Sequence, residues 1–415
     1  MRRSGSFPSR ARLALAGAVA LATIAACTRH GDTNWIYSPG AHWPARSIMP
    51  ANANGLLVTT NNLDDTLSFL DAQTLAPRAT IPVGLNLVEL EGPHHLVTSK
   101  DGQFLFIGLT ETFPTSSAGP HGSHGSGTVP GYVVKMRLSD GAIVGQARVD
   151  RNPGDLVLSP DGAKLYVSHF DIKRILDQTA AGGTEDSKLS GIAVIDTATM
   201  NRDALVMVCP AEHGMAISPD GAKLYVTCYG SDSVAIVDLT QASLPHTVIP
   251  VGTTPGELPG TTSYAPYAAT LSSDGRIVWL SCWNSGDLRA LIVSSGQMNL
   301  AATQTVGGYP SFGAKWGDKT IFARQSGNPA LADDHLVVLD AAGTIVSNFV
   351  YPSSQCVNMH QARLVPGQDG KAFLVCEGNH VAKGSILRVD LGTGAVEATA
   401  QVGVFPDALS FVGAP

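Results

Sequence analysis

Histidines recur at one position of a repeated motif, and their side chains are the ones in this sequence best suited to chemistry. His94, His213 and His360 each stand eight residues before the glycine of a turn, once two extra residues in the last turn are allowed for. Tyr267 holds this position in another copy, and Asp407 holds it in the last one. Imidazole suits copper, zinc and iron. If these positions meet in space, they predict a site for a metal or a polar ligand.

The remaining copies carry Gly154 and Ser311 at this position. His169 ends the next strand of its copy and is expected near the same place, whereas His95 is expected to point elsewhere. No HxH or HxxxH pair supplies two ligands on one element. Three interpretations therefore stay open: a transition metal held by His94, His213 and His360, a polar small molecule or protein, or side chains that only hydrogen-bond to loop backbone.

The cysteines form a second pattern that accompanies two of these histidines. Cys209 and Cys228 are 19 residues apart, and Cys356 and Cys376 are 20 apart, with the first member of each pair four residues before a histidine. Two disulfides are expected, each stabilising the fold by about 3 kcal/mol. The competing interpretation makes these cysteines metal ligands together with the histidines. Cys282 matches the second member of each pair but has no partner, which predicts a free thiol.

Repeated hairpins are the elements that must position these residues. Each copy has an apolar strand, an SPDG-like turn and a second apolar strand, and the Asp-Gly pair suits a tight turn with positive φ. A third strand ending in Asp and a fourth strand follow, and the unit recurs about every 40 to 60 residues. Six copies are recognised, in the ranges 92–108, 152–171, 211–230, 264–286, 308–327 and 358–378.

Four short antiparallel strands per unit predict an all-β fold, a β-propeller whose blades pack face to face. The N-terminal unit lacks its first strand, and VFPDALSFV at the C-terminus has nothing after it. We expect this last strand to complete the first blade, which closes the ring by pairing of the N- and C-terminal strands and gives seven blades. Six or eight blades are the alternatives. Insertions at 110–130 and 170–190 separate second and third strands, and His121 and His124 of the first insertion are expected on a flexible loop.

The N-terminus reads as an export signal. Residues 1–26 combine four arginines with an apolar stretch too short to span a bilayer. Ile24-Ala25-Ala26-Cys27 resembles a bacterial lipobox, so lipidation of Cys27 is expected, with an ordinary signal peptide as the alternative. Residues 27–50 are then a lipidated tether, and residues 51–415 form a single propeller domain. We expect a lipid-anchored protein of the bacterial cell envelope, extracytoplasmic, in the outer membrane or periplasm.

PDGAKLYVTC, followed by SDSVAIVDL and TVIPVG, resembles the repeats of YVTN-type, YncE-like seven-bladed propellers of bacterial secreted and surface proteins. The resemblance covers roughly residues 54–415 and implies the fold more firmly than a function, because members serve as scaffolds, surface proteins and domains of oxidoreductases. Some relatives in fold hold copper through axial histidines, and cytochromes accompany others. This chain has no CxxCH motif for a covalent c-type haem.

Composition narrows the function further. The net charge of -7 and the lack of a basic run after the first dozen residues argue against nucleic-acid binding. No GxSxG, P-loop or GxGxxG motif is present. The sequence therefore favours a monomeric, lipid-anchored binding scaffold for a protein, small ligand or metal. The alternative is a copper or iron oxidoreductase that uses the channel histidines, with an envelope protein or cytochrome as partner.

Overall fold

The structure is a computed structural model that describes residues 55–84, 91–111, 124–258, 262–326 and 333–413. The expected signal peptide, the tether, Cys27 and His121 lie outside these residues. Contacts divide the chain into residues 1–38 and residues 39–415, and all described residues belong to the second unit. No helix within the described ranges is long and apolar enough to cross a membrane.

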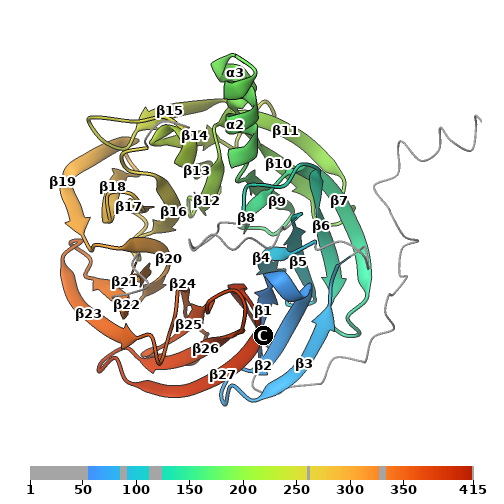
Figure 1. The fold of residues 1–415 in the computed structure, drawn as a ribbon, viewed down its shortest axis with the longest axis vertical. Coiled ribbons are helices and arrows are strands. Elements are labelled where there is room, and N and C mark those ends of the chain that lie inside the picture. The colour runs from blue at the N-terminus through green and yellow to red at the C-terminus, as the bar shows by residue number, and fades with distance from the viewer. Residues whose placement is uncertain (1–54, 85–90, 112–123, 259–261, 327–332, 414–415) are drawn as a thin grey trace, which may run out of the picture. The chain divides into compact units, whose positions relative to one another are not determined.

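Antiparallel sheets are the main structure of the described chain, and they follow one another around a centre (Figure 1). The first sheet joins the two ends of the domain: β28 (Pro406–Val412) pairs with β1 (Leu56–Asn61), followed by β2 (Thr66–Asp71) and β3 (Pro77–Pro82). This pairing confirms the expected closure of the ring.

Four further sheets have four strands each in chain order. They comprise β4 (Pro93–Thr98), β5 (Phe104–Leu109), β6 (Pro130–Arg137) and β7 (Ile143–Arg151); β8 (Pro153–Leu158), β9 (Lys164–His169), β10 (Ser190–Asp196) and β11 (Arg202–Cys209); β12 (Glu212–Ile217), β13 (Lys223–Cys228), β14 (Ser233–Asp238) and β15 (His246–Pro250); β16 (Pro266–Leu271), β17 (Ile277–Cys282), β18 (Asp287–Ile292) and β19 (Gln297–Thr305). Each of these four repeats thus forms one sheet.

The last sheet has eight strands. They are β20 (Tyr309–Trp316), β21 (Lys319–Gln325), β22 (Asp333–Leu339), β23 (Ile345–Pro352), β24 (Met359–Arg363), β25 (Lys371–Cys376), β26 (Lys383–Asp390) and β27 (Val396–Val404). Its two antiparallel halves are joined where Phe312 of β20 pairs in parallel with Gln361 of β24. The described strands therefore form six sheets, so the predicted count of seven blades is not confirmed.

The turns explain why the repeats fold in this way. Gly102, Gly162, Gly221 and Gly275 follow the turn aspartates, and all four have positive φ. In the turn of β12 and β13, the Asp220 carboxylate accepts a hydrogen bond from the Ala222 amide at 3.0 Å. These aspartates are turn formers, as the sequence predicted. The insertion between β9 and β10 forms two helices, α2 (Ile172–Ala180) and α3 (Glu185–Lys188). Two short 3-10 helices, η1 (Asn62–Asp64) and η2 (Tyr229–Ser231), follow β1 and β13.

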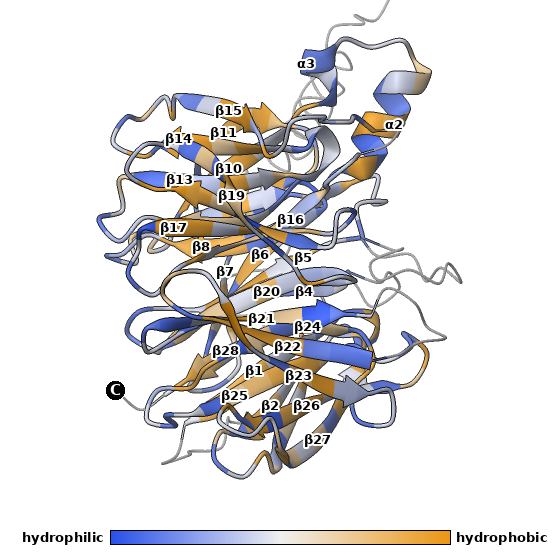
Figure 2. Cartoon of the chain, turned by 90° about the vertical axis from the view of Figure 1, so that its left-hand side faces the viewer, coloured by the Kyte–Doolittle hydropathy of each residue, from blue (hydrophilic) through white to orange (hydrophobic). Residues whose placement is uncertain are grey.

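The core lies between neighbouring sheets. Val58 and Phe69 pack with Leu105 and Val134 of the next sheet in one of several such apolar clusters. Apolar residues accordingly concentrate along the strands, while many loops are hydrophilic (Figure 2). Burial of these faces supplies the main stabilisation and fixes the positions of the innermost strands.

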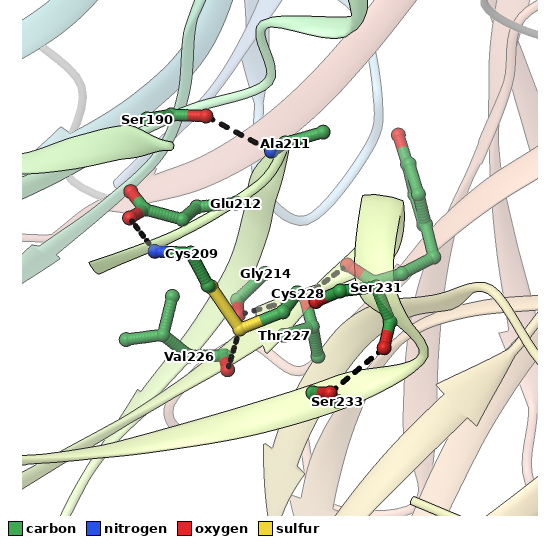
Figure 3. Close-up of a disulfide and its surroundings, with 11 residues drawn as sticks. Ser190, Cys209, Ala211, Glu212, Gly214, Val226, Thr227, Cys228, Ser231 and Ser233 are labelled. Carbon is green, nitrogen blue, oxygen red and sulfur yellow. Dashed lines mark hydrogen bonds between the residues drawn. A yellow bond between two sulfur atoms is a disulfide. The ribbon is translucent and has the colours of Figure 1, made fainter. Parts of the chain in front are cut away.

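Two disulfides connect the end of an outer strand or its loop to the next hairpin, as the sequence predicted. Cys209–Cys228 has a Cα–Cα distance of 5.7 Å, and Cys356–Cys376 one of 5.3 Å. Figure 3 shows the first of them, with the Glu212 carboxylate accepting a hydrogen bond from the Cys209 amide at 3.2 Å. Cys282 is free and buried. Disulfides persist in oxidising compartments, so they indicate an extracytoplasmic protein.

Candidate functional site

The seven strands that begin the repeats carry the predicted site residues, and the labels β4, β8, β12, β16, β20 and β24 stand around the centre in Figure 1. The backbone at these positions is tied from one repeat to the next. The hydroxyls of Thr60, Ser168, Thr227 and Ser281 donate to the carbonyls of His94, His213, Tyr267 and Ser311, respectively. Each of these hydroxyl residues lies next to the last residue of a first or second strand.

A bulge recurs at the same place in these strands. The register between β4 and β5 shifts between Pro93 and Leu96, and that between β24 and β25 shifts between Met359 and Gln361. Equivalent shifts occur where β8, β12, β16, β20 and β28 meet their partners. A bulge bends the strand and redirects side chains. This irregularity explains why two successive histidines, His94 and His95, can both reach one cluster.

Imidazole rings from three repeats and one insertion meet at the centre. The ring centroid of His94 lies 4.5 Å from that of His95, 4.1 Å from that of His124 and 5.6 Å from that of His213. The His95 centroid lies 5.6 Å from that of His213 and 6.0 Å from that of His360. We call these five histidines, together with Asp407, the histidine cluster. All six side chains are buried.

The Asp407 carboxylate lies between three of these imidazoles. Its Oδ2 atom is 3.2 Å from His94 Nε2 and 3.6 Å from His124 Nε2. Its Oδ1 atom is 2.8 Å from His360 Nδ1. One buried anion therefore contacts imidazoles that come from three different parts of the chain.

Hydrogen bonds at Nδ1 orient several of the rings. His94 Nδ1 lies 2.9 Å from the Pro153 carbonyl, and His213 Nδ1 lies 3.2 Å from the Tyr267 carbonyl. His95 Nδ1 lies 2.9 Å from the Asp155 carboxylate. Carbonyl and carboxylate oxygens accept, so Nδ1 carries the proton and Nε2 keeps its lone pair. Metal-binding histidines are commonly oriented by such a bond at the other nitrogen.

His95 Nε2 is a nitrogen of the cluster that the described residues leave without a hydrogen bond. This atom is buried and makes no hydrogen bond to any described residue. A buried polar atom without a partner costs about 1–3 kcal/mol.

The pKa shifts describe a cluster of mostly neutral imidazoles around a charged carboxylate. Burial lowers the pKa of His94 to about 4 and lowers the pKa values of His124 and His213 well below the usual one. Burial also lowers the pKa of His360, but the Asp407 and Glu377 carboxylates together outweigh burial and the net shift is upward. Burial would raise the pKa of Asp407, yet His94 and His360 hold it well below its usual range. Neutral imidazole is the form that binds metals.

Aromatic rings border the cluster on one side. The Tyr267 ring stacks on His213 with a centroid distance of 3.9 Å and on Trp283 with a distance of 3.8 Å. The Tyr267 hydroxyl lies 3.3 Å from His360 Nε2. Phe312 contacts His95 edge-on at 4.8 Å. Tyr229 lies farther out, 6.3 Å from Trp283.

The structure brings together His94, His213, Tyr267, His360 and Asp407, which the aligned positions predicted. It places His169 elsewhere: its two ring nitrogens bond to the Gly191 carbonyl of its own sheet and to the Asp150 amide of the preceding sheet, so it connects the backbones of two neighbouring sheets. Both partners of His169 belong to β7 and β10. No described contact joins His169 to the histidine cluster.

Two cluster members were placed wrongly from the sequence. His95 was expected to point elsewhere, but the bulge directs it into the cluster. His124 was expected on a flexible surface loop, but it is buried, and the Asn62 amide nitrogen lies 3.1 Å from its Nε2. His124 reaches the cluster from outside the repeated hairpins, and no local pattern in a Gly/Ser-rich segment signals such a contact. Phe312, next to the expected Ser311, supplies the ring that contacts the cluster from β20.

Three overlapping sets of residues have the geometry of a metal site. They are His94, His95 and His213; His94, His124 and Asp407; and His95, His360 and Asp407. Within each set, one potential ligand atom from every residue lies within 4.8 Å of those of the other two. The donors are imidazole nitrogen with one carboxylate, which suits copper, zinc and iron.

No protein-family model matches the sequence, and no curated protein matches it either. Solved structures match through their fold. A periplasmic gluconolactonase, PpgL, from Pseudomonas aeruginosa is 16% identical with a TM-score of 0.60, and the match covers 87% of this chain and 99% of that one. A putative 6-phosphogluconolactonase from Bacteroides fragilis is 14% identical with a TM-score of 0.59, covering 87% and 99%.

A hydrazine synthase from Kuenenia stuttgartiensis is also similar, at 16% identity and a TM-score of 0.56, with 79% of this chain and 91% of that chain covered. At such identities the likeness concerns the fold alone, and it supports a β-propeller. These names do not transfer to this chain, because unrelated functions share the fold.

Proposed function

We propose that this protein is an extracytoplasmic β-propeller that binds a transition metal ion in the histidine cluster. The observation that carries the proposal is the convergence of five buried imidazoles and the Asp407 carboxylate, with a buried His95 Nε2 that has no hydrogen-bond partner among the described residues. An apolar or merely structural centre would leave such a nitrogen unsatisfied at a cost in stability.

The donor set narrows the class of metal. Every set with metal-site geometry contains at least two imidazoles, and only Asp407 supplies oxygen. Calcium and magnesium prefer oxygen ligands. Copper and zinc accept imidazole readily, and copper has the highest affinity in the usual divalent order. We therefore expect copper or zinc before iron.

The test is the metal content of the mature protein, purified without a polyhistidine tag and measured by elemental analysis. We expect stoichiometric copper or zinc in the wild type and a loss of at least tenfold in affinity for His213→Ala. The surface variant His246→Gln is the control and should keep full occupancy. A wild-type protein that stays metal-free after incubation with copper and zinc would overturn the proposal.

An oxidoreductase using this metal is the second candidate, and the stack of Tyr267 between His213 and Trp283 is the observation that favours it. Aromatic side chains in contact with a redox metal can carry an electron toward a partner such as a cytochrome. Trp283→Leu should then slow reduction of the copper-loaded protein by a protein donor without changing its copper content. An unchanged rate would leave metal binding as the function.

We propose three further features that fit this function. The eight-stranded sheet represents two blades joined by the single pair of Phe312 and Gln361, which gives seven blades. Lipid is attached at Cys27, so that the monomeric propeller is anchored at the membrane of the cell envelope. The chain is a YncE-like member of the YVTN-type repeats that its motifs resemble. Mass spectrometry of the N-terminal peptide tests the lipid directly, and a Cys27→Ser variant should lose it and leave the membrane fraction.

A further inference from the structure

We propose that the histidine cluster holds two metal ions bridged by the Asp407 carboxylate, an inference that rests on the proposed function. The first ion has His94 and His124 as its imidazole ligands, and the second has His95 and His360. The two sets with metal-site geometry that contain Asp407 share no other residue. One ion would therefore leave two of the four imidazoles without a metal.

The carboxylate faces both sets. The Asp407 Oδ2 atom lies 3.2 Å from His94 Nε2 and 3.6 Å from His124 Nε2, while Oδ1 lies 2.8 Å from His360 Nδ1. A carboxylate that directs its two oxygens toward different groups of ligands is suited to bridge two cations. Its negative charge between the ions also offsets part of their mutual repulsion.

The two sets come from different segments, which keeps their ligands apart. His94 and His95 follow each other at the bulge of β4, so each ion takes one of them. His124 reaches the first set from the insertion between β5 and β6, and His360 reaches the second from β24. A site for a single ion would need only one of these two contributions.

His213 has a place in this arrangement that neither Asp407-containing set requires. It forms the third set with His94 and His95, one imidazole from each proposed ion. Its ring centroid is 5.6 Å from both of theirs. We assign His213 as a residue that contacts the space between the two ions, and its loss should weaken both.

A second carboxyl group lies beside His360, in the second set of ligands. Glu377 is buried, and its Oε1 atom lies 3.8 Å from His360 Nδ1, while Oε2 lies 2.8 Å from His380 Nε2. Together with Asp407 it places two acidic side chains near the second ion and one near the first.

The experiment is a titration of the metal-free, untagged mature protein with Cu²⁺, followed by removal of unbound copper and elemental analysis. We expect two copper ions per chain in the wild type. His124→Gln removes a ligand of the first ion alone and should leave one. His246→Gln, a change at a surface histidine, should retain two.

Electron paramagnetic resonance of the same samples provides an independent readout. Two Cu²⁺ ions bridged by a carboxylate are magnetically coupled, so the wild-type signal should integrate to fewer spins than its copper content. His124→Gln should give one uncoupled spin per copper. Asp407→Asn, if it folds, should lose the coupling.

The outcomes separate the two proposals. A wild type that binds no copper or zinc overturns both of them. A wild type that saturates at one ion, or a His124→Gln variant that still binds two, overturns the dinuclear centre and leaves the proposed metal-binding function intact. Two ions per chain with an uncoupled signal would equally contradict the bridge.

Discussion

Two kinds of hairpin carry residues to the centre. They differ in what fixes the segment that leads into their first strand. The hairpins β12–β13 and β24–β25 each carry a disulfide from the end of the second strand to a cysteine four residues before the cluster histidine. The hairpin β16–β17 has Cys282 at the corresponding strand end, but this cysteine is free. Its inward residue is Tyr267 where the other two have His213 and His360.

A carboxylate takes the place of the missing disulfide in the third hairpin. Asp232 is buried and accepts hydrogen bonds from four backbone amides, of which Ser263, Tyr264 and Ala265 lead into β16 and Gly256 lies in the preceding loop. The comparison teaches that the same position of the fold can be held either covalently or by one side chain that satisfies several amides. Among these three hairpins, the two that carry a disulfide have an inward histidine, whereas β4–β5 carries His94 and His95 without a disulfide in the described residues.

Removing the Asp232 carboxylate should have the largest effect on stability. Asp232→Ala leaves four amides without their acceptor, and an unsatisfied buried donor costs about 1–3 kcal/mol. We expect the free energy of unfolding to fall by about 4 kcal/mol, measured by urea denaturation. Asp238→Ala, which removes a partly exposed turn carboxylate, should cost clearly less. Equal losses in the two variants would show that the hydrogen bonds of Asp232 do not fix the segment that leads into β16.

Removing either disulfide should have the next largest effect. The loops closed are similar, with separations of 19 and 20 residues, so Cys209→Ala/Cys228→Ala and Cys356→Ala/Cys376→Ala should each lose about 3 kcal/mol. Urea denaturation measures both. If the disulfides also fix the histidines, each double variant should bind copper more weakly, whereas Asp238→Ala should bind it as the wild type does. An unchanged copper affinity would show that the disulfides do not fix the positions of the cluster histidines.

His169 ends β9, at the position where β13, β17 and β25 end in a cysteine. Its protonation makes the stability of this strand end depend on pH. Burial lowers the pKa of His169 to about 4, while that of an unfolded histidine is about 6.5. Because the unfolded chain binds the proton first, stability falls as the pH falls from about 6.5 toward 4. This one group should contribute about 2 kcal/mol of loss at pH 5.

The measurement is the difference in unfolding free energy between pH 7 and pH 5. His169→Gln should lose about 2 kcal/mol less over this interval than the wild type, and the surface variant His246→Gln should match the wild type. An unaltered pH dependence in His169→Gln would contradict a buried neutral imidazole at this strand end.

The unpaired cysteine should show the smallest effect. Burial raises the pKa of the Cys282 thiol well above its usual value, so little thiolate is present at pH 8. In a soluble form that starts after Cys27, a thiol reagent should detect no thiol in the folded protein and one after unfolding. Cys282→Ala should cost about 1 kcal/mol. Rapid labelling of the folded protein would show that the Cys282 thiol is accessible to the reagent, which would contradict its burial.

The repeats made much of the fold predictable. Asp-Gly turns and strand lengths recur in the sequence, so the hairpins, the pairing of β1 with β28 and the inward positions of His213 and His360 follow from alignment of the copies. The disulfides follow because two copies share the same cysteine spacing. The predicted count of seven blades is not confirmed by the described strands, which form six sheets because the pair of Phe312 and Gln361 joins two repeats; this contact has no sequence signal.

The cluster was only partly predictable for a physical reason. Alignment assigns one inward residue per strand, whereas a bulge lets β4 direct both His94 and His95 to the centre. His124 reaches the site by long-range packing of an insertion, where its ring stacks on Phe405 with a centroid distance of 5.0 Å. His169 was assigned to the site because strand ends lie close together in the repeat, but its hydrogen bonds turn it into the sheet.

The most direct test of metal binding in the histidine cluster is an anomalous difference map from crystals of the untagged protein grown with copper. Data collected on both sides of the copper absorption edge locate the metal without assumptions about its ligands. Our account predicts strong peaks within coordination distance of the His94 and His95 imidazoles. A map without density there, with copper only at surface histidines such as His246, would contradict it.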